Sequence, residues 1–260
     1  MLLHHQQRGE GPPVILLHGL FGSAANLGMV ARGLAAHYRV YSLDLPNHGR
    51  SPRRDSMGYS DMAADVARFI RDMKLAPCAV LGHSMGGKVA MQLALECPEL
   101  AERIVIADIA PVQYPPHHGD VLAGLDAVAA AQPTDRRQAD DVLAEHVAEA
   151  GVRAFLLKSW QPRDDGGWNW LINRQAVRSN YPKLGAPNHP PVPGGCYEGP
   201  ALFIIGSESD YVRPEHRDAT LALFPRAQVK VLEGAGHWLH AEKPSAFNTQ
   251  VLRFLQGSAT

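Results

Sequence analysis

Six short apolar runs, each bounded by glycine or a polar residue, constrain the fold of this 260-residue chain more than any other feature. The runs alternate with amphipathic stretches, a pattern typical of βαβ units on a mostly parallel sheet. We therefore predict an α/β protein with helices flanking that sheet. The expected strands are residues 14–17, 38–43, 79–81, 104–107, 202–205 and 229–232.

Three amphipathic segments that follow expected strands are predicted to be helices. In residues 60–74 the apolar side chains recur at the spacing of one helix face. The other two expected helices are residues 85–95 and 244–255. Together with the strands they lie in residues 1–111 and 201–260, which we predict to form one α/β core.

The alternation of strands and helices stops after Asp108. Residues 112–200 contain no convincing strand, and their end is rich in proline and glycine, which predicts a return linker. We expect helices over 120–131, 134–150 and 152–160, with Thr134 as an N-cap and Gly151 as a stop.

The simplest interpretation of residues 112–200 is a helical cap inserted between two strands. Such a cap leaves the sheet at the carboxyl ends of the strands, where α/β sheets bind ligands. The alternative is an irregular extension without a functional role.

A G-x-S-x-G motif at residues 82–86 follows an expected strand and opens an expected helix. This context is typical of a nucleophile elbow, in which Ser84 occupies a strained turn and the flanking glycines allow close packing. The helix start directs backbone N–H groups at developing negative charge. We therefore predict Ser84 as a nucleophile.

A serine hydroxyl needs a base, and His237 is the best of the thirteen histidines. It follows the last expected strand in a Gly-Ala-Gly loop, and the order serine, acid, histidine is that of α/β-hydrolases. His240 forms an H-x-x-H with His237, but a pair without a third ligand is weak evidence for zinc. No metal or organic cofactor is implied.

The acid of the triad has two candidates. Asp108 ends the fourth expected strand, and Asp210 follows the fifth. The usual acid position after the later strand is Ser209, so Asp210 lies one residue late. We favour Asp108 and keep Asp210 as the alternative acid.

A glycine-rich stretch at residues 18–22 follows the first expected strand. We expect a backbone N–H there, that of Leu20, to form an oxyanion hole together with the N–H of Met85. The alternative is a plain glycine-rich turn.

At these residues the chain resembles the α/β-hydrolase superfamily and, within it, the YbfF-type esterases. The matching strings cover nearly the whole chain. They are HGLFGSAANLG at 18–28, LDLPNHGRSP at 43–52, LGHSMGGKVAM at 81–91, ADIAPVQY at 107–114, FLLKSW at 155–160 and GAGHWLHAEKP at 234–244.

The resemblance implies an α/β-hydrolase core with a helical cap and a cleft open to bulky acyl esters and thioesters. It also implies Ser84 as nucleophile, His237 as base and Asp108 as acid. Ser209 then hydrogen-bonds within the His–Asp system, and Tyr211 contacts substrate.

The chain departs from this family pattern at two places. Asp210 replaces a proline, which restores a rival carboxylate, and His117 and His118 stand where the cap usually carries arginine. The expected substrate-binding residues are Phe21, Tyr211, His118 and Trp160, although Phe21 and the cap tryptophans fit a packing role equally well.

The predicted function is a serine carboxylesterase acting on acyl esters or thioesters. The same triad is compatible with C–C bond hydrolysis, acyl transfer or perhydrolysis, because fold and triad do not fix the reaction. A non-catalytic ligand-binding protein is a further alternative. A P-loop reading of Gly82 to Lys88 is weaker, since Val89 replaces the hydroxyl residue that holds Mg²⁺.

The charge balance excludes partners that need a basic surface. There are 25 Lys and Arg residues against 26 Asp and Glu residues. The chain therefore has no positive electrostatic field that would attract nucleic acid or an anionic membrane. Three cysteines at unrelated spacings favour a reducing compartment. With no signal peptide and no apolar run of spanning length, we expect a soluble, cytoplasmic monomer or weak homo-oligomer.

Overall fold

The computed structural model describes residues 2–164 and 166–257. Its main sheet has the strand order β1-β3-β2-β4-β5-β8-β9, in which β1 pairs antiparallel with β3 and the other neighbours pair parallel. The predicted α/β class with a mostly parallel sheet is confirmed. The strands are β1 (His5–Arg8), β2 (Pro13–Leu17), β3 (Arg39–Leu43), β4 (Cys78–His83), β5 (Ala101–Ala107), β8 (Ala201–Gly206) and β9 (Ala227–Leu232).

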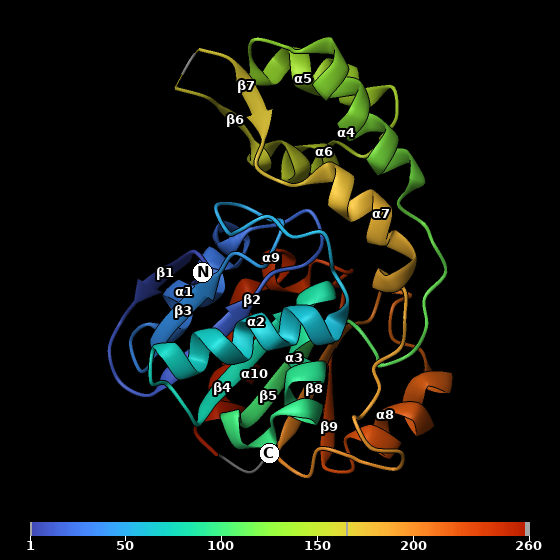
Figure 1. The fold of residues 1–260 in the computed structure, drawn as a ribbon. Coiled ribbons are helices and arrows are strands. Elements are labelled where there is room, and N and C mark those ends of the chain that lie inside the picture. Colours follow the sequence, from blue (N-terminus) through green and yellow to red (C-terminus); the bar gives the residue numbers. More distant parts are fainter. Residues whose placement is uncertain (1, 165, 258–260) are drawn as a thin grey trace.

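Helices cover both faces of this sheet (Figure 1). Alternate residues of a strand point to opposite faces. Ile15 therefore packs in the cluster with α2 (Tyr59–Asp72), while its neighbours Val14 and Leu16 pack in the cluster with α1 (Gly28–Leu34) and α10 (Pro244–Leu255). The helical elements of the core are η1 (Ala24–Leu27), α1 (Gly28–Leu34), α2 (Tyr59–Asp72), α3 (Met85–Glu96), η2 (Pro98–Leu100), η4 (Pro214–His216), α8 (Arg217–Leu223), α9 (Leu239–Glu242) and α10 (Pro244–Leu255).

The segment between β5 and β8 forms a separate group of elements above the sheet in Figure 1. It is mainly helical, as the sequence predicts, and it also holds a short antiparallel hairpin of β6 and β7. Its elements are α4 (Gly119–Ala131), α5 (Arg136–Ala144), α6 (Ala150–Leu156), η3 (Leu157–Ser159), β6 (Trp160–Pro162), β7 (Trp168–Trp170) and α7 (Arg174–Leu184).

Several local expectations for this segment are wrong. The β6–β7 hairpin contradicts the expectation that residues 112–200 contain no strand. Trp160 and Trp170 pair across this hairpin, and their ring centroids lie 5.0 Å apart. The N-cap of α5 is Asp135 instead of Thr134, since the Asp135 carboxylate accepts the N–H of Gln138 at 2.8 Å. Gly151 lies inside α6 and stops no helix.

One buried lysine ties both chain connections of this segment to the core. Lys88 on α3 is 1% exposed, and its Nζ donates to the carbonyl oxygens of Val112 at 2.5 Å and Ala186 at 2.8 Å. These carbonyls lie where the chain leaves β5 for α4 and where it returns after α7. Burial lowers the pKa of Lys88 to about 7.

This pKa predicts a pH-dependent contribution of Lys88 to stability. Between about pH 7 and 10.5 the unfolded chain holds a proton on this amine that the folded chain has lost, so the folded state gains stability as the pH rises. Lys88→Met removes this gain. We expect the free energy of unfolding of wild type minus that of Lys88→Met to increase from pH 7 to 10 in urea titrations. The exposed Lys183→Met is the control, and a difference for Lys88→Met that stays flat with pH contradicts the prediction.

Candidate active site

The loops that follow five parallel strands meet at one edge of the sheet. Ser84 follows β4, Asp108 follows β5, Ser209 lies after β8, and His237 lies after β9. The Gly19 loop follows β2. Parallel strands bring their carboxyl ends to the same edge, so residues more than 200 positions apart become neighbours.

Ser84 occupies a strained turn between β4 and α3, as the motif predicts. Its backbone has φ 52° and ψ −119°, a region that L-residues rarely adopt. The chain packs tightly on both sides, because a Cβ on Gly82 would lie 2.1 Å from the Gly86 carbonyl oxygen and one on Gly86 would lie 2.3 Å from that of Leu17. The turn therefore admits only glycine at these two positions and presents Ser84 above the sheet.

His237 connects Ser84 to Asp108 through both nitrogens of its ring. Nδ1 lies 2.7 Å from Asp108 Oδ2, and Nε2 lies 3.0 Å from Ser84 Oγ. A carboxylate only accepts hydrogen bonds, so Nδ1 carries the proton and Nε2 is free to accept the Ser84 hydroxyl proton. This tautomer is the one a general base requires.

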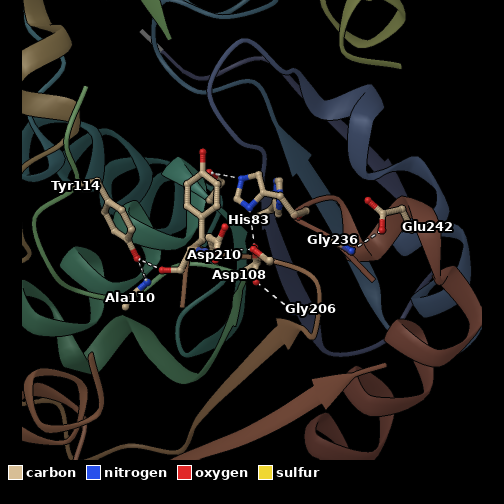
Figure 2. Close-up of polar contacts among 12 residues, drawn as sticks. His83, Asp108, Ala110, Tyr114, Gly206, Asp210, Gly236 and Glu242 are labelled. Carbon is tan, nitrogen blue, oxygen red and sulfur yellow. Dashed lines mark hydrogen bonds and ion pairs between the residues drawn. The ribbon is translucent and has the colours of Figure 1, made fainter. Parts of the chain in front are cut away.

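The Asp108 carboxylate is fully buried and fixed by two further donors. The Gly206 N–H donates to Oδ1 at 3.1 Å, a contact drawn in Figure 2, and the Ser209 hydroxyl donates to Oδ2. Asp108 also has φ 53°, a second strained backbone at the site. These contacts aim the carboxylate at His237.

Of the two candidate acids, the structure brings Asp108 to His237. Asp210 is exposed, and its backbone carbonyl accepts from Arg213 Nε at 3.0 Å. Ser209, one position earlier, is the residue of this loop that contacts Asp108 (Asp108 and Asp210 are both labelled in Figure 2).

The loop that carries His237 is held by contacts to its backbone. His83 Nε2 donates to the His237 carbonyl at 2.8 Å, and the Gly236 N–H donates to Glu242 at 2.6 Å (Figure 2). Burial lowers the pKa of His83 well below its usual value, so this ring is neutral. His240 is buried 4.4 Å from the His83 ring, and the described residues contain no group of three or more potential metal ligands.

The two expected oxyanion donors lie close to Ser84. Met85 is the first residue of α3, and Leu20 lines the cavities that open at Ser84. The Gly19 loop approaches so closely that a Cβ on Gly19 would lie 3.4 Å from Ser84 Cβ. The placement fits a site for negative charge beside Oγ.

Two cavities meet at Ser84. The larger has a volume of about 440 Å³ and the smaller about 180 Å³. The residues that line both are Leu20, Ser84, His117, His118 and Tyr211.

Three of the four predicted substrate-binding residues lie at these cavities. Phe21 lines the larger one with φ 64°, and its ring meets His118 edge-on at 5.5 Å. The Tyr211 ring stacks on the His237 ring, with 3.8 Å between the ring centroids and 14° between the ring planes. Trp160 instead packs in the core of the helical segment against Trp168 and Trp170, so its expected contact with substrate is replaced by a packing role.

Two residues that sequence reasoning left without a role shape the site. The Tyr114 hydroxyl donates to the Tyr211 carbonyl at 2.5 Å and accepts the Ala110 N–H (Figure 2), and His117 Nε2 lies 2.5 Å from the Tyr211 hydroxyl. Both precede α4, in a stretch without a periodic signal. A search for tyrosine and histidine between Asp108 and α4 would have found them.

The alpha/beta hydrolase fold family matches the chain over residues 12–244. The chain belongs to this family. As an α/β hydrolase, it is 38% identical over 251 residues to "Esterase YbfF" of Escherichia coli (strain K12), covering 96% of this chain and 95% of the relative. It is 37% identical over 252 residues to the mouse "sn-1-specific diacylglycerol lipase ABHD11", covering 94% and 81%.

A solved structure described as "Marine microorganism esterase" has the same fold as this α/β hydrolase, with a TM-score of 0.93. It is 34% identical, and the match covers 97% of this chain and 99% of the other. The expected α/β-hydrolase family and its YbfF-type branch are confirmed. Over the part of the chain that the structure describes, no helix combines the length and apolarity needed to span a membrane.

The tight turn at Ser84 predicts that Gly82 does not tolerate a side chain. In Gly82→Ala the new methyl meets backbone atoms of Gly86 and Gly87, which cannot move aside, so we expect a loss of about 1–3 kcal/mol in free energy of unfolding. Gly28→Ala is the matched control. It meets nothing within 4 Å and has helical φ −60°, so it should stabilise by about 0.4–1 kcal/mol. Urea denaturation measures both, and equal stability of the two variants contradicts the argument.

Proposed function

We propose that Ser84, His237 and Asp108 are the catalytic triad of a serine carboxylesterase that cleaves acyl esters or thioesters through an acyl-enzyme. The family and the esterase names of its relatives identify the chain as an ester hydrolase. The observation that carries the triad is the unbroken chain of contacts from the buried carboxylate through the imidazole to the hydroxyl.

The reaction follows from this geometry. His237 Nε2 takes the Ser84 proton as Oγ attacks the carbonyl carbon, and the N–H groups of Leu20 and Met85 hold the oxyanion. The imidazolium then protonates the leaving group. Water activated by His237 hydrolyses the acyl-enzyme, and Asp108 keeps the ring oriented and stabilises its positive charge. The Ser209 hydroxyl donates to Oδ2, the same carboxylate oxygen that His237 contacts.

We propose that residues 112–200 act as a cap over a core of residues 1–111 and 201–260. The partner is a small-molecule ester, in contact with Phe21, His118 and Tyr211. The free cysteines Cys78, Cys97 and Cys196 support a cytoplasmic location. A monomer or weak homo-oligomer is sufficient, because one chain supplies every residue of this site.

Acyl transfer is the second candidate. A relative 34% identical over 265 residues is named "Probable alcohol acetyltransferase" in Saccharomyces cerevisiae (strain ATCC 204508 / S288c). In this reaction an alcohol takes the place of water as the acceptor of the acyl group. Ester exchange products that outnumber free acid at modest alcohol concentration would favour transfer over hydrolysis.

The choice of acid predicts unequal effects of two conservative substitutions. Asp108→Asn removes the carboxylate that sets the His237 tautomer, so we expect turnover of an activated ester to fall by about 10⁴-fold. Asp210→Asn changes an exposed side chain and should leave turnover close to wild type. Steady-state kinetics of both variants test this, and a larger loss in Asp210→Asn would transfer the role of acid to Asp210.

Covalent labelling tests the nucleophile without any knowledge of the substrate. A fluorophosphonate reacts only with an activated serine, so wild type should gain one adduct by intact mass and Ser84→Ala none. Ser207→Ala, which removes a nearby serine outside the triad, is the control and should label like wild type. An unlabelled wild type would favour the non-catalytic binding protein.

A further inference from the structure

The two cavities share Ser84 but differ in their other lining residues, including His237. His237 lines the larger cavity and is absent from the lining of the smaller one. Met85 and Ile109 line the smaller cavity and are absent from the larger. An ester has an acyl group and a leaving group, and each has its own required contact with the triad.

The leaving group is assigned by the path of the proton. After attack, the proton on His237 Nε2 goes to the leaving oxygen or sulfur, which therefore lies within hydrogen-bond reach of Nε2. The rest of the leaving group continues into the cavity that His237 lines, which is the larger one. With the oxyanion beside Leu20 and Met85, the acyl chain is left to point into the smaller cavity.

The two cavities differ in size and in wall chemistry. At about 440 Å³ the larger falls in the range of drug-sized ligand pockets, whereas about 180 Å³ lies below that range. The larger cavity has apolar walls from the cap and from the loop after β9. They include Val121, Val152, Phe155, Leu156 and Trp238, while Asp120, His146 and Glu149 add polar groups to the same cavity.

The smaller cavity has rigid walls. Ile109 and Tyr59 are buried, and the Tyr59 hydroxyl donates to the Leu184 carbonyl at 2.5 Å. Lys88 contributes to its lining, but Nζ is bound by the Val112 and Ala186 carbonyls. The Lys88 amine is therefore occupied by these two carbonyls and closes one end of the smaller cavity. The walls of this cavity fit an uncharged acyl group.

We propose that the enzyme is selective for esters or thioesters of a short, uncharged acyl group with a bulky apolar alcohol or thiol. The acyl group occupies the smaller cavity and the leaving group the larger one. This inference rests on the proposed triad and oxyanion hole. It makes the leaving group the bulky part of the substrate, whereas the sequence resemblance implies a bulky acyl chain.

Two ester series, one varying the acyl group and one varying the alcohol, test which cavity binds which part of the substrate. The first keeps 4-nitrophenol and extends the acyl chain from acetyl to decanoyl. The second keeps acetyl and enlarges the alcohol from methyl to 2-naphthylmethyl, with acid release followed by pH-stat. We expect kcat/KM to fall at least about tenfold from butanoyl to decanoyl and to rise at least about tenfold from methyl to 2-naphthylmethyl.

Two variants that change the cavity volumes show which cavity binds the acyl group and which binds the leaving group. Leu184→Ala enlarges the smaller cavity and should raise the decanoyl-to-butanoyl ratio of kcat/KM. Val152→Trp fills the larger cavity and should lower the naphthylmethyl-to-methyl ratio by about tenfold. Each variant should leave the other ratio as in wild type. Because the comparisons are ratios within one variant, a partial loss of folded protein does not affect them.

The outcomes separate this inference from the proposed function. If kcat/KM rises with acyl length and Val152→Trp alters acyl selectivity, the acyl chain lies in the larger cavity and the assignment is wrong, while the triad stands. If no ester is cleaved and the fluorophosphonate does not label Ser84, the proposed function fails and this inference fails with it.

Discussion

The arrangement at the site depends on one buried carboxylate. Asp108 is removed from water, and such a burial is costly unless the charge is hydrogen-bonded. Its partners are the Gly206 N–H, the Ser209 hydroxyl and the imidazole of His237. By satisfying the carboxylate, these donors also fix the ring whose other nitrogen faces Ser84.

The parallel sheet is what makes these partners available. Asp108, Ser209 and His237 come from consecutive positions in the strand order, β5, β8 and β9, although more than 120 residues separate the first from the last. The left-handed backbone of Ser84 and of Asp108 then turns each side chain out of its strand direction. Local strain of this kind persists because the surrounding packing holds it in place.

Much of this arrangement was open to prediction from the sequence. Strand ends and glycine motifs placed Ser84 and His237 correctly at one edge, because those signals are local. The choice between Asp108 and Asp210 depended on where a side chain points after a strand, which residue type alone does not determine; here Ser209 takes the position facing Asp108.

Other features had no local signal to find. Strand β1 is a polar HQQR segment that pairs only at the sheet edge, so it lacks the apolar run by which buried strands are recognised. The β6–β7 hairpin is three residues a side, and it depends on the contact between Trp160 and Trp170. Helix propensity across 134–150 also overestimated α5, which ends at Ala144.

Lys88 stands four positions after Ser84, one turn further along α3. The same short helix thus begins next to Ser84 and, on its next turn, carries the amine that binds both chain connections of the helical segment. A tilt of that segment would strain hydrogen bonds made from the first turn of the helix that follows Ser84. Movement of the helical segment is therefore coupled through α3 to the position of Ser84 and to the two cavities that meet there.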